Sequence, residues 1–111
     1  MNETNNPALI SVEDIHKKIE EGENLTIIDV RTEEEYNEGH IKDSALLTLD
    51  TLESKVEEVF PDKDAEMYVY CRSGGRSSMA QMTMERLGYT NTKNISGGIL
   101  EWEEKGYNLE S

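Results

Sequence analysis

The sequence has few of the residues on which metal sites and disulfides depend. Among its 111 residues are one cysteine, Cys71, and two histidines, His16 and His40. A single cysteine cannot form an internal disulfide, and without several well-spaced histidines it cannot form a zinc site. We therefore expect no metal and no bound cofactor, and we assign any chemistry to a free thiol or to carboxylates.

Basic side chains are also scarce. The chain has 11 Lys and Arg against 24 Asp and Glu, which gives a formal net charge of −13, and its pI is about 4.4. Binding to nucleic acid requires a basic face that displaces counterions from phosphate, and an anionic membrane surface attracts clustered lysine. The charge therefore argues against nucleic acid and against a membrane as partners.

Long hydrophobic runs are absent. No run approaches the length of a membrane span, and residues 1–7 have neither the basic part nor the apolar part of a signal peptide. We therefore expect a cytoplasmic protein. The length suits one domain, and because no repeat, linker or low-complexity tract interrupts the chain, we expect a single domain over residues 1–111 with its core at about 8–108.

Short apolar runs alternate with helical patterns along the chain. The runs typical of strands are 8–10, 25–30, 45–47, 66–70 and 92–95. Between them lie amphipathic stretches, of which the first three are expected to begin at Ser11, Thr32 and Asp50. This alternation predicts an α/β protein with an open sheet and right-handed crossovers.

Side-chain positions within the helices can also be predicted. In the helix after residue 77, helical spacing places Met79 and Met84 on the buried face and Gln81 on the opposite face. We expect Trp102, in the last helix, to belong to the core. We expect His16 to lie on the flank of the first helix without a role.

The segment 71–77, Cys-Arg-Ser-Gly-Gly-Arg-Ser, carries the strongest chemical signal. It joins a predicted strand to a predicted helix, and in an open parallel sheet such loops line the crevice at the carboxyl ends of the strands. Backbone N–H groups of residues 72–76 can converge on the Cys71 sulfur, and the positive end of the following helix points toward it. We therefore expect a Cys71 thiolate at neutral pH that acts as a nucleophile.

The alternative for a lone cysteine at the end of a strand is an inert, buried packing residue. The neighbouring residues favour function, because arginine packs poorly in a core and binds anions well, while paired glycines let the backbone approach a ligand. We therefore expect Cys71 to be catalytic. The residues expected to bind the substrate are Arg72, Ser73, Gly74, Gly75, Arg76 and Ser77.

Several motifs occur together with this loop in a characteristic order. They are Ile-Asp-Val-Arg (28–31), Glu35-Tyr36, Gly39-His40-Ile41, the segment 70–77, Leu87-Gly88-Tyr89, and Gly97-Gly98-Ile99 with Trp102. On these motifs the chain resembles a single-domain rhodanese, a sulfurtransferase, over almost its whole length. The resemblance implies a mainly parallel five-stranded sheet flanked by helices on both faces, and a cysteine that accepts sulfane sulfur as a persulfide.

Loop length separates this chemistry from that of a small phosphatase or arsenate reductase. Phosphatase-type loops hold one more residue between the cysteine and the arginine than the four residues, Arg72 to Gly75, found here. The longer loop surrounds a tetrahedral phosphate, whereas the shorter one, which the rhodanese family uses, suits a single sulfur atom bound to the cysteine. We therefore favour persulfide chemistry.

The expected mechanism is ping-pong. The Cys71 thiolate attacks the outer sulfur of a small anionic donor such as thiosulfate, while Arg72 and Arg76 hold the oxyanion. Because there is no second cysteine, the acceptor is external: cyanide, glutathione, a thioredoxin-like protein or another sulfur carrier. The alternative is a sulfur-relay or regulatory binding module with little turnover of small donors. We expect a monomer or weak dimer.

Three residues outside the loop are candidates for support. Asp29 and Arg31 end the second predicted strand, and a mutual structural ion pair that braces the fold with Glu35 or His40 is favoured over direct chemistry. We expect His40 to hold a corner of the chain by hydrogen bonds rather than to titrate in the reaction.

Two expectations concern the rim of the site. Asp43 and Thr48 stand where the family usually has a glycine and a proline, so we expect a differently shaped turn.

Residues 66–89 hold three arginines against two glutamates. We therefore expect a small cationic mouth inside an acidic shell, and protein acceptors with a basic rim.

Overall fold

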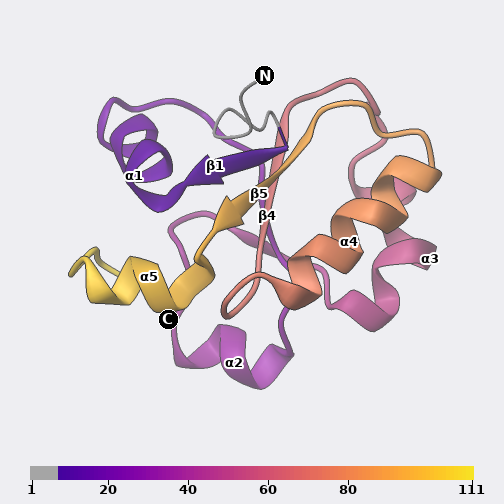
Figure 1. The fold of residues 1–111 in the computed structure, drawn as a ribbon. Helices are drawn as coiled ribbons and strands as arrows, with labels where there is room; N and C mark the ends of the chain where they lie inside the picture. Colours follow the sequence, from indigo (N-terminus) through magenta and orange to yellow (C-terminus); the bar gives the residue numbers. More distant parts are fainter. Residues whose placement is uncertain (1–7) are drawn as a thin grey trace.

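The computed structural model describes residues 8–111 and contains a five-stranded parallel sheet between two layers of helices (Figure 1). The strand order is β1-β5-β4-β2-β3, and every neighbouring pair is parallel. The strands are β1 (Leu9–Ser11), β2 (Ile27–Asp29), β3 (Ala45–Leu46), β4 (Met67–Tyr70) and β5 (Thr92–Ser96). The helices are α1 (Val12–Glu20), α2 (Glu33–Glu38), α3 (Leu49–Val59), α4 (Gly75–Arg86) and α5 (Gly98–Glu104). The predicted fold class is confirmed.

Both faces of the sheet are covered. In Figure 1, α1 and α5 lie on one side of the strands and α3 and α4 on the other. Successive side chains of β4 enter the two cores alternately: Val69 packs with the α3 and α4 layer, and Tyr68 and Tyr70 pack with the α1 and α5 layer. Cys71 continues the alternation and packs on the α3 and α4 side. None of the helices within residues 8–111 is long and apolar enough to cross a membrane.

The first two helices begin where their sequence signals predict. Ser11 Oγ accepts a hydrogen bond of 3.0 Å from the Asp14 backbone, and Thr32 forms a reciprocal capping box with Glu35. The prediction for the third helix start was wrong, since α3 begins at Leu49 and Asp50 lies inside its first turn. The reason is a tertiary contact, because the Leu49 N–H donates to the carbonyl of Val30, which directly follows β2.

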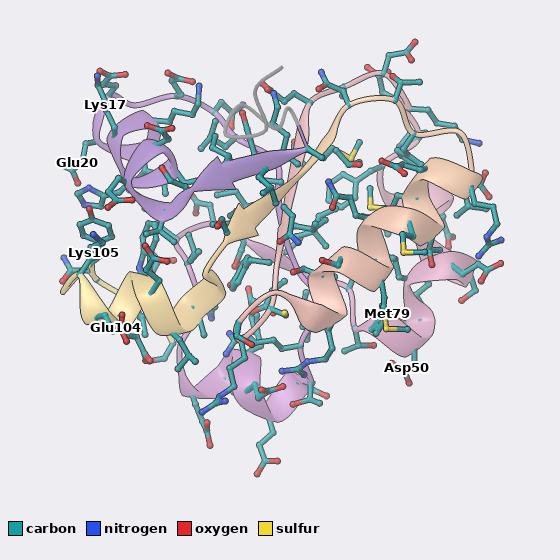
Figure 2. The ribbon with its side chains drawn as sticks, in the orientation of Figure 1. Lys17, Glu20, Asp50, Met79, Glu104 and Lys105 are labelled. Atoms are coloured by element: carbon teal, nitrogen blue, oxygen red, sulfur yellow. The ribbon has the colours of Figure 1, made fainter. Side chains whose placement is uncertain are left out.

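The predicted buried face of α4 was right for Met84, which is fully buried, and wrong for Met79 and Gln81. Met79 is 59% exposed, whereas Gln81 is buried and its amide donates to the carbonyls of Ala8 and Thr92 at 2.8 and 3.1 Å. The buried stripe is Ser77, Ala80, Gln81 and Met84. Its phase follows from Ser77, which the loop places against the Cys71 sulfur. Figure 2 labels Met79 on the side of the molecule that also carries Asp50 of α3.

Aromatic residues join α1 to α5. Trp102 is in the core, as predicted. His16, predicted to have no role, stacks on the Tyr107 ring with 3.8 Å between centroids and meets Trp102 edge to face, so it joins α1 to the end of α5. In the turn before β3, Asp43 has φ of +61°, the left-handed conformation that a glycine adopts readily.

Candidate active site

The Cys71 loop begins at the carboxyl end of β4. The neighbouring strand β2 ends beside it, since Asp29 is in register with Tyr70, the residue before the cysteine. Gly74 has φ of +128° and no atom within 4 Å of the place a Cβ would take. A glycine is therefore needed there for its backbone conformation rather than for space. This conformation turns the chain directly into α4 at Gly75.

Several hydrogen-bond donors converge on the Cys71 sulfur. The backbone N–H groups of Gly74 and Ser77 lie 3.1 and 3.4 Å from Sγ, and the Ser77 hydroxyl lies 3.4 Å from it. Burial alone raises the pKa of Cys71, but the hydrogen bonds from Ser77, Gly74 and the Ser73 backbone outweigh burial, so its pKa is lowered. Because Cys71 is only 1% exposed, this is a shielded sulfur in a ring of donors that favours the thiolate.

Asn94 of β5 orients the Ser77 hydroxyl, and sequence reasoning missed it. Ser77 Oγ lies 2.8 Å from Asn94 Oδ1 and 3.2 Å from the Gly74 carbonyl, so its single proton can be donated to one of these oxygens or to the sulfur at a time. The other end of the Asn94 amide donates to Ser78 Oγ at 3.1 Å. In the sequence Asn94 stands among other polar residues of a mostly polar strand, so no signal marks this position.

The start of α5 holds the outer side of the loop. The N–H groups of Ile99 and Leu100 donate to the carbonyls of Cys71 and Arg72 at 3.0 and 3.1 Å. Gly98, with φ of +59°, lies so close that a Cβ there would be 2.5 Å from both carbonyl oxygens. The sequence marks Gly98 only as part of the motif Gly97-Gly98-Ile99, and its supporting role depends on a contact that sequence spacing does not reveal.

The two arginines of the loop have different surroundings. Arg76 donates two hydrogen bonds to the Glu35 carboxylate, at 2.8 and 3.1 Å. Arg72 has no carboxylate partner within residues 8–111 and lines a pocket of about 220 Å³ together with Glu35, Glu38 and Glu103. The prediction of a cationic mouth was therefore wrong, because glutamates from α2 and α5, which lie outside residues 66–89, stand beside the arginines.

Asp29 and Arg31 form the predicted mutual ion pair. The Arg31 guanidinium donates to Asp29 Oδ2 at 2.6 Å and to the Gly39 carbonyl at 2.7 Å. The Tyr70 hydroxyl also donates to Asp29, at 2.8 Å, and burial, followed by the Asp29 charge, raises the pKa of Tyr70. Both members of the pair are buried. The hydrogen-bond partners of Asp29 and Arg31 all lie within the protein, so this ion pair serves to stabilise the fold.

The expected partners of this pair were wrong, since neither the Glu35 nor the His40 side chain joins it. Glu35 binds Arg76 instead. His40 Nδ1 lies 2.9 Å from the Tyr36 carbonyl, its ring stacks on Tyr36 at 3.7 Å, and its backbone exchanges two hydrogen bonds with Glu110. His40 therefore holds a corner between α2 and the chain end, as the sequence predicted, and does not contact the Cys71 sulfur.

The arrangement can stabilise a negative charge on one sulfur atom. Residues 8–111 contain no group of three or more His, Cys, Asp or Glu side chains that could hold a metal ion. The donors around Cys71 are backbone amides and a hydroxyl, which can bind a thiolate or a sulfur attached to it.

Comparisons with known proteins place this geometry in context. A family model described as a rhodanese-like domain matches residues 11–105, which include β2 to β5 and the whole Cys71 loop. The putative sulfur carrier protein YrkF of Bacillus subtilis (strain 168) is 35% identical over 96 residues, which cover 86% of this chain and about half, 51%, of that protein. A sulfurtransferase of Allochromatium vinosum is 31% identical over 97 residues, with coverage of 87% and 89%. The solved structure of the human single-domain sulfurtransferase TSTD1 has 26% identity, a TM-score of 0.77 and coverage of 96% and 100%.

Proposed function

The chain belongs to the rhodanese-like domain family of sulfurtransferases, and we propose that it carries sulfane sulfur as a persulfide on Cys71. The observation that supports this proposal is the convergence of the Gly74 and Ser77 N–H groups and the Ser77 hydroxyl on Sγ. These donors lower the pKa of Cys71 despite its burial. They therefore supply a nucleophile and, after transfer, a place for the charge of the new sulfur.

The loading step transfers one sulfur atom. The Cys71 thiolate attacks the outer sulfur of thiosulfate, a Cys71–sulfur bond forms, the sulfur–sulfur bond of the donor breaks and sulfite leaves with the bonding electron pair. Arg72 has no carboxylate partner among the described residues, so it is the loop arginine that is free to bind the sulfite oxygens. The burial of Cys71 favours a donor that presents a single exposed sulfur.

The second half-reaction needs an external acceptor. Because the chain has one cysteine, a thiolate from outside attacks the outer sulfur of the Cys71 persulfide, takes that sulfur and leaves the Cys71 thiolate. We propose cyanide or a thiol such as glutathione, a thioredoxin-like protein or a sulfur carrier as acceptor, in a cytoplasmic setting. No part of this scheme requires a metal or an organic cofactor.

A sulfur-relay module is the second candidate. The relative named as a putative sulfur carrier supports it, and so do the glutamates beside the loop, which disfavour small anions. Steady-state kinetics with thiosulfate and cyanide separate the candidates. Turnover that depends on Cys71 supports the enzyme, whereas poor turnover together with persulfide transfer to a protein thiol supports the module.

Intact mass spectrometry after incubation with thiosulfate tests the proposal directly. We expect the wild-type chain to gain the mass of one sulfur atom and Cys71→Ser to gain none. Because Ser retains a similar shape at a buried position, thermal unfolding of the variant is expected to remain close to that of the wild type. If the wild-type chain gains no sulfur from thiosulfate or from a persulfide donor, the proposed function is wrong.

A further inference from the structure

Glu35 belongs to α2 but reaches the active loop from a separate part of the fold. Its two carboxylate oxygens accept hydrogen bonds from Arg76 Nη1 and Nη2 at 2.8 and 3.1 Å. The same carboxylate accepts from the Thr32 backbone and hydroxyl at 3.0 and 3.1 Å, which completes the capping box of α2. Thr32 and Arg76 therefore both hold the Glu35 carboxylate. This carboxylate occupies the two guanidinium nitrogens of Arg76 that an oxyanion would otherwise bind.

The ion pair changes which cation is available beside the sulfur. The hydrogen bonds that Arg76 donates to Glu35 raise the pKa of Arg76, and the charge of the nearby Cys71 also contributes. Hydrogen bonding to Arg76 lowers the pKa of Glu35 to about 2, so the carboxylate stays charged at neutral pH. Arg76 is thus neutralised by a permanent partner, and Arg72 shares its pocket with three glutamates.

Building on the proposed persulfide function, we propose that Glu35 is a specificity-determining residue that disfavours oxyanion donors such as thiosulfate and favours alkyl persulfides. With an alkyl persulfide, the Cys71 thiolate attacks the outer sulfur and a Cys71–sulfur bond forms. The sulfur–sulfur bond of the donor breaks and an alkyl thiolate leaves with the bonding electron pair, while the proton stays on the transferred sulfur. An alkyl thiolate leaving group has one charged atom and gains little from a bidentate guanidinium. Sulfite has three oxygens and would gain from Arg76, which Glu35 withholds.

The test compares Glu35→Gln with Glu34→Gln. A glutamine at position 35 can keep the capping box, but it no longer neutralises Arg76. Glu34 lies in the same helical turn, is exposed and has no ion pair among the described residues, so Glu34→Gln removes the same charge without touching Arg76. Loading of Cys71 is measured with thiosulfate and with hydroxyethyl persulfide, whose organic part is uncharged, and thermal unfolding is recorded for each variant.

We expect the half-saturating thiosulfate concentration to fall about tenfold in Glu35→Gln, the order of one charge-assisted hydrogen bond gained. The value for hydroxyethyl persulfide is expected to stay the same, and Glu34→Gln is expected to behave like the wild type with both donors. An unchanged donor preference in Glu35→Gln, or an equal gain in Glu34→Gln, overturns the proposed role of Glu35 but leaves the persulfide function intact. Failure of the wild-type chain to load with either donor overturns the persulfide function and this role with it.

Discussion

Two clusters of polar groups lie side by side at the carboxyl ends of β2 and β4, and they use their hydrogen bonds in opposite ways. Around Asp29, every strong donor has a partner within the protein: Arg31 and Tyr70 bind the carboxylate, and Arg31 also binds the Gly39 carbonyl. Around Cys71, several donors face one sulfur atom. The first cluster has satisfied groups and serves as a brace, whereas the second is prepared for a negative charge.

The comparison shows that charge and burial alone do not identify a reactive site. Asp29 is fully buried and paired with a buried arginine, yet it offers no free position to a substrate. Cys71 is equally buried, but its donors come from a loop and from the first turn of α4, which the neighbouring elements hold in place. A site becomes reactive when donors are fixed before the charge that they stabilise appears.

The largest expected effect comes from breaking the brace. Asp29→Asn leaves the Arg31 guanidinium buried without its carboxylate, so we expect the free energy of unfolding to fall by about 3–5 kcal/mol. Urea unfolding measures this loss. The double variant Asp29→Asn, Arg31→Gln removes the uncompensated charge and is expected to recover part of the stability. A small loss in the single variant would contradict the assignment of this pair as a brace.

A smaller effect is expected from the contact between α5 and the loop. Gly98→Ala places a Cβ against the carbonyls of Cys71 and Arg72, whereas Gly106→Ala, with φ of +79°, meets no atom within 4 Å. Both variants pay the backbone cost of a left-handed alanine, about 1 kcal/mol. We expect only Gly98→Ala to slow persulfide loading, by about tenfold to a hundredfold, because it displaces the loop. Loading rates and thermal unfolding, measured together, check this difference.

The smallest expected effect concerns the Ser77 hydroxyl. The loading rate should rise with pH as the Cys71 thiol loses its proton, and it should level off above the pKa of Cys71. Because Ser77→Ala removes one donor to the thiolate, we expect the midpoint to move upward by about one pH unit, with little change in the rate at high pH. Ser73→Ala retains the backbone N–H and Ser77→Thr retains the hydroxyl, so both should keep the wild-type midpoint. An unshifted midpoint in Ser77→Ala would show that backbone donors alone lower the pKa.

Much of this architecture could be predicted because it rests on local signals. The caps at Ser11 and Thr32, the apolar strand runs and the paired glycines of the loop each act over a few residues, and the structure has these features where the sequence predicts them. The start of α3 and the exposed position of Met79 were mispredicted. Helical spacing gives the periodicity of a helix, but contacts with the sheet and the loop set which face is buried.

From the order of its residues alone, this chain already specified the strand and helix pattern, the place of Cys71 after a buried strand, and the glycines that let backbone amides approach the sulfur. Only the tertiary structure brought Glu35 to Arg76, Asn94 to Ser77 and the start of α5 to the Cys71 carbonyl. The physical reason is range. Propensity, capping and turn conformation act between near neighbours in the chain, whereas the charge balance and the orientation of donors at the sulfur depend on groups that meet only when separate strands and helices pack together.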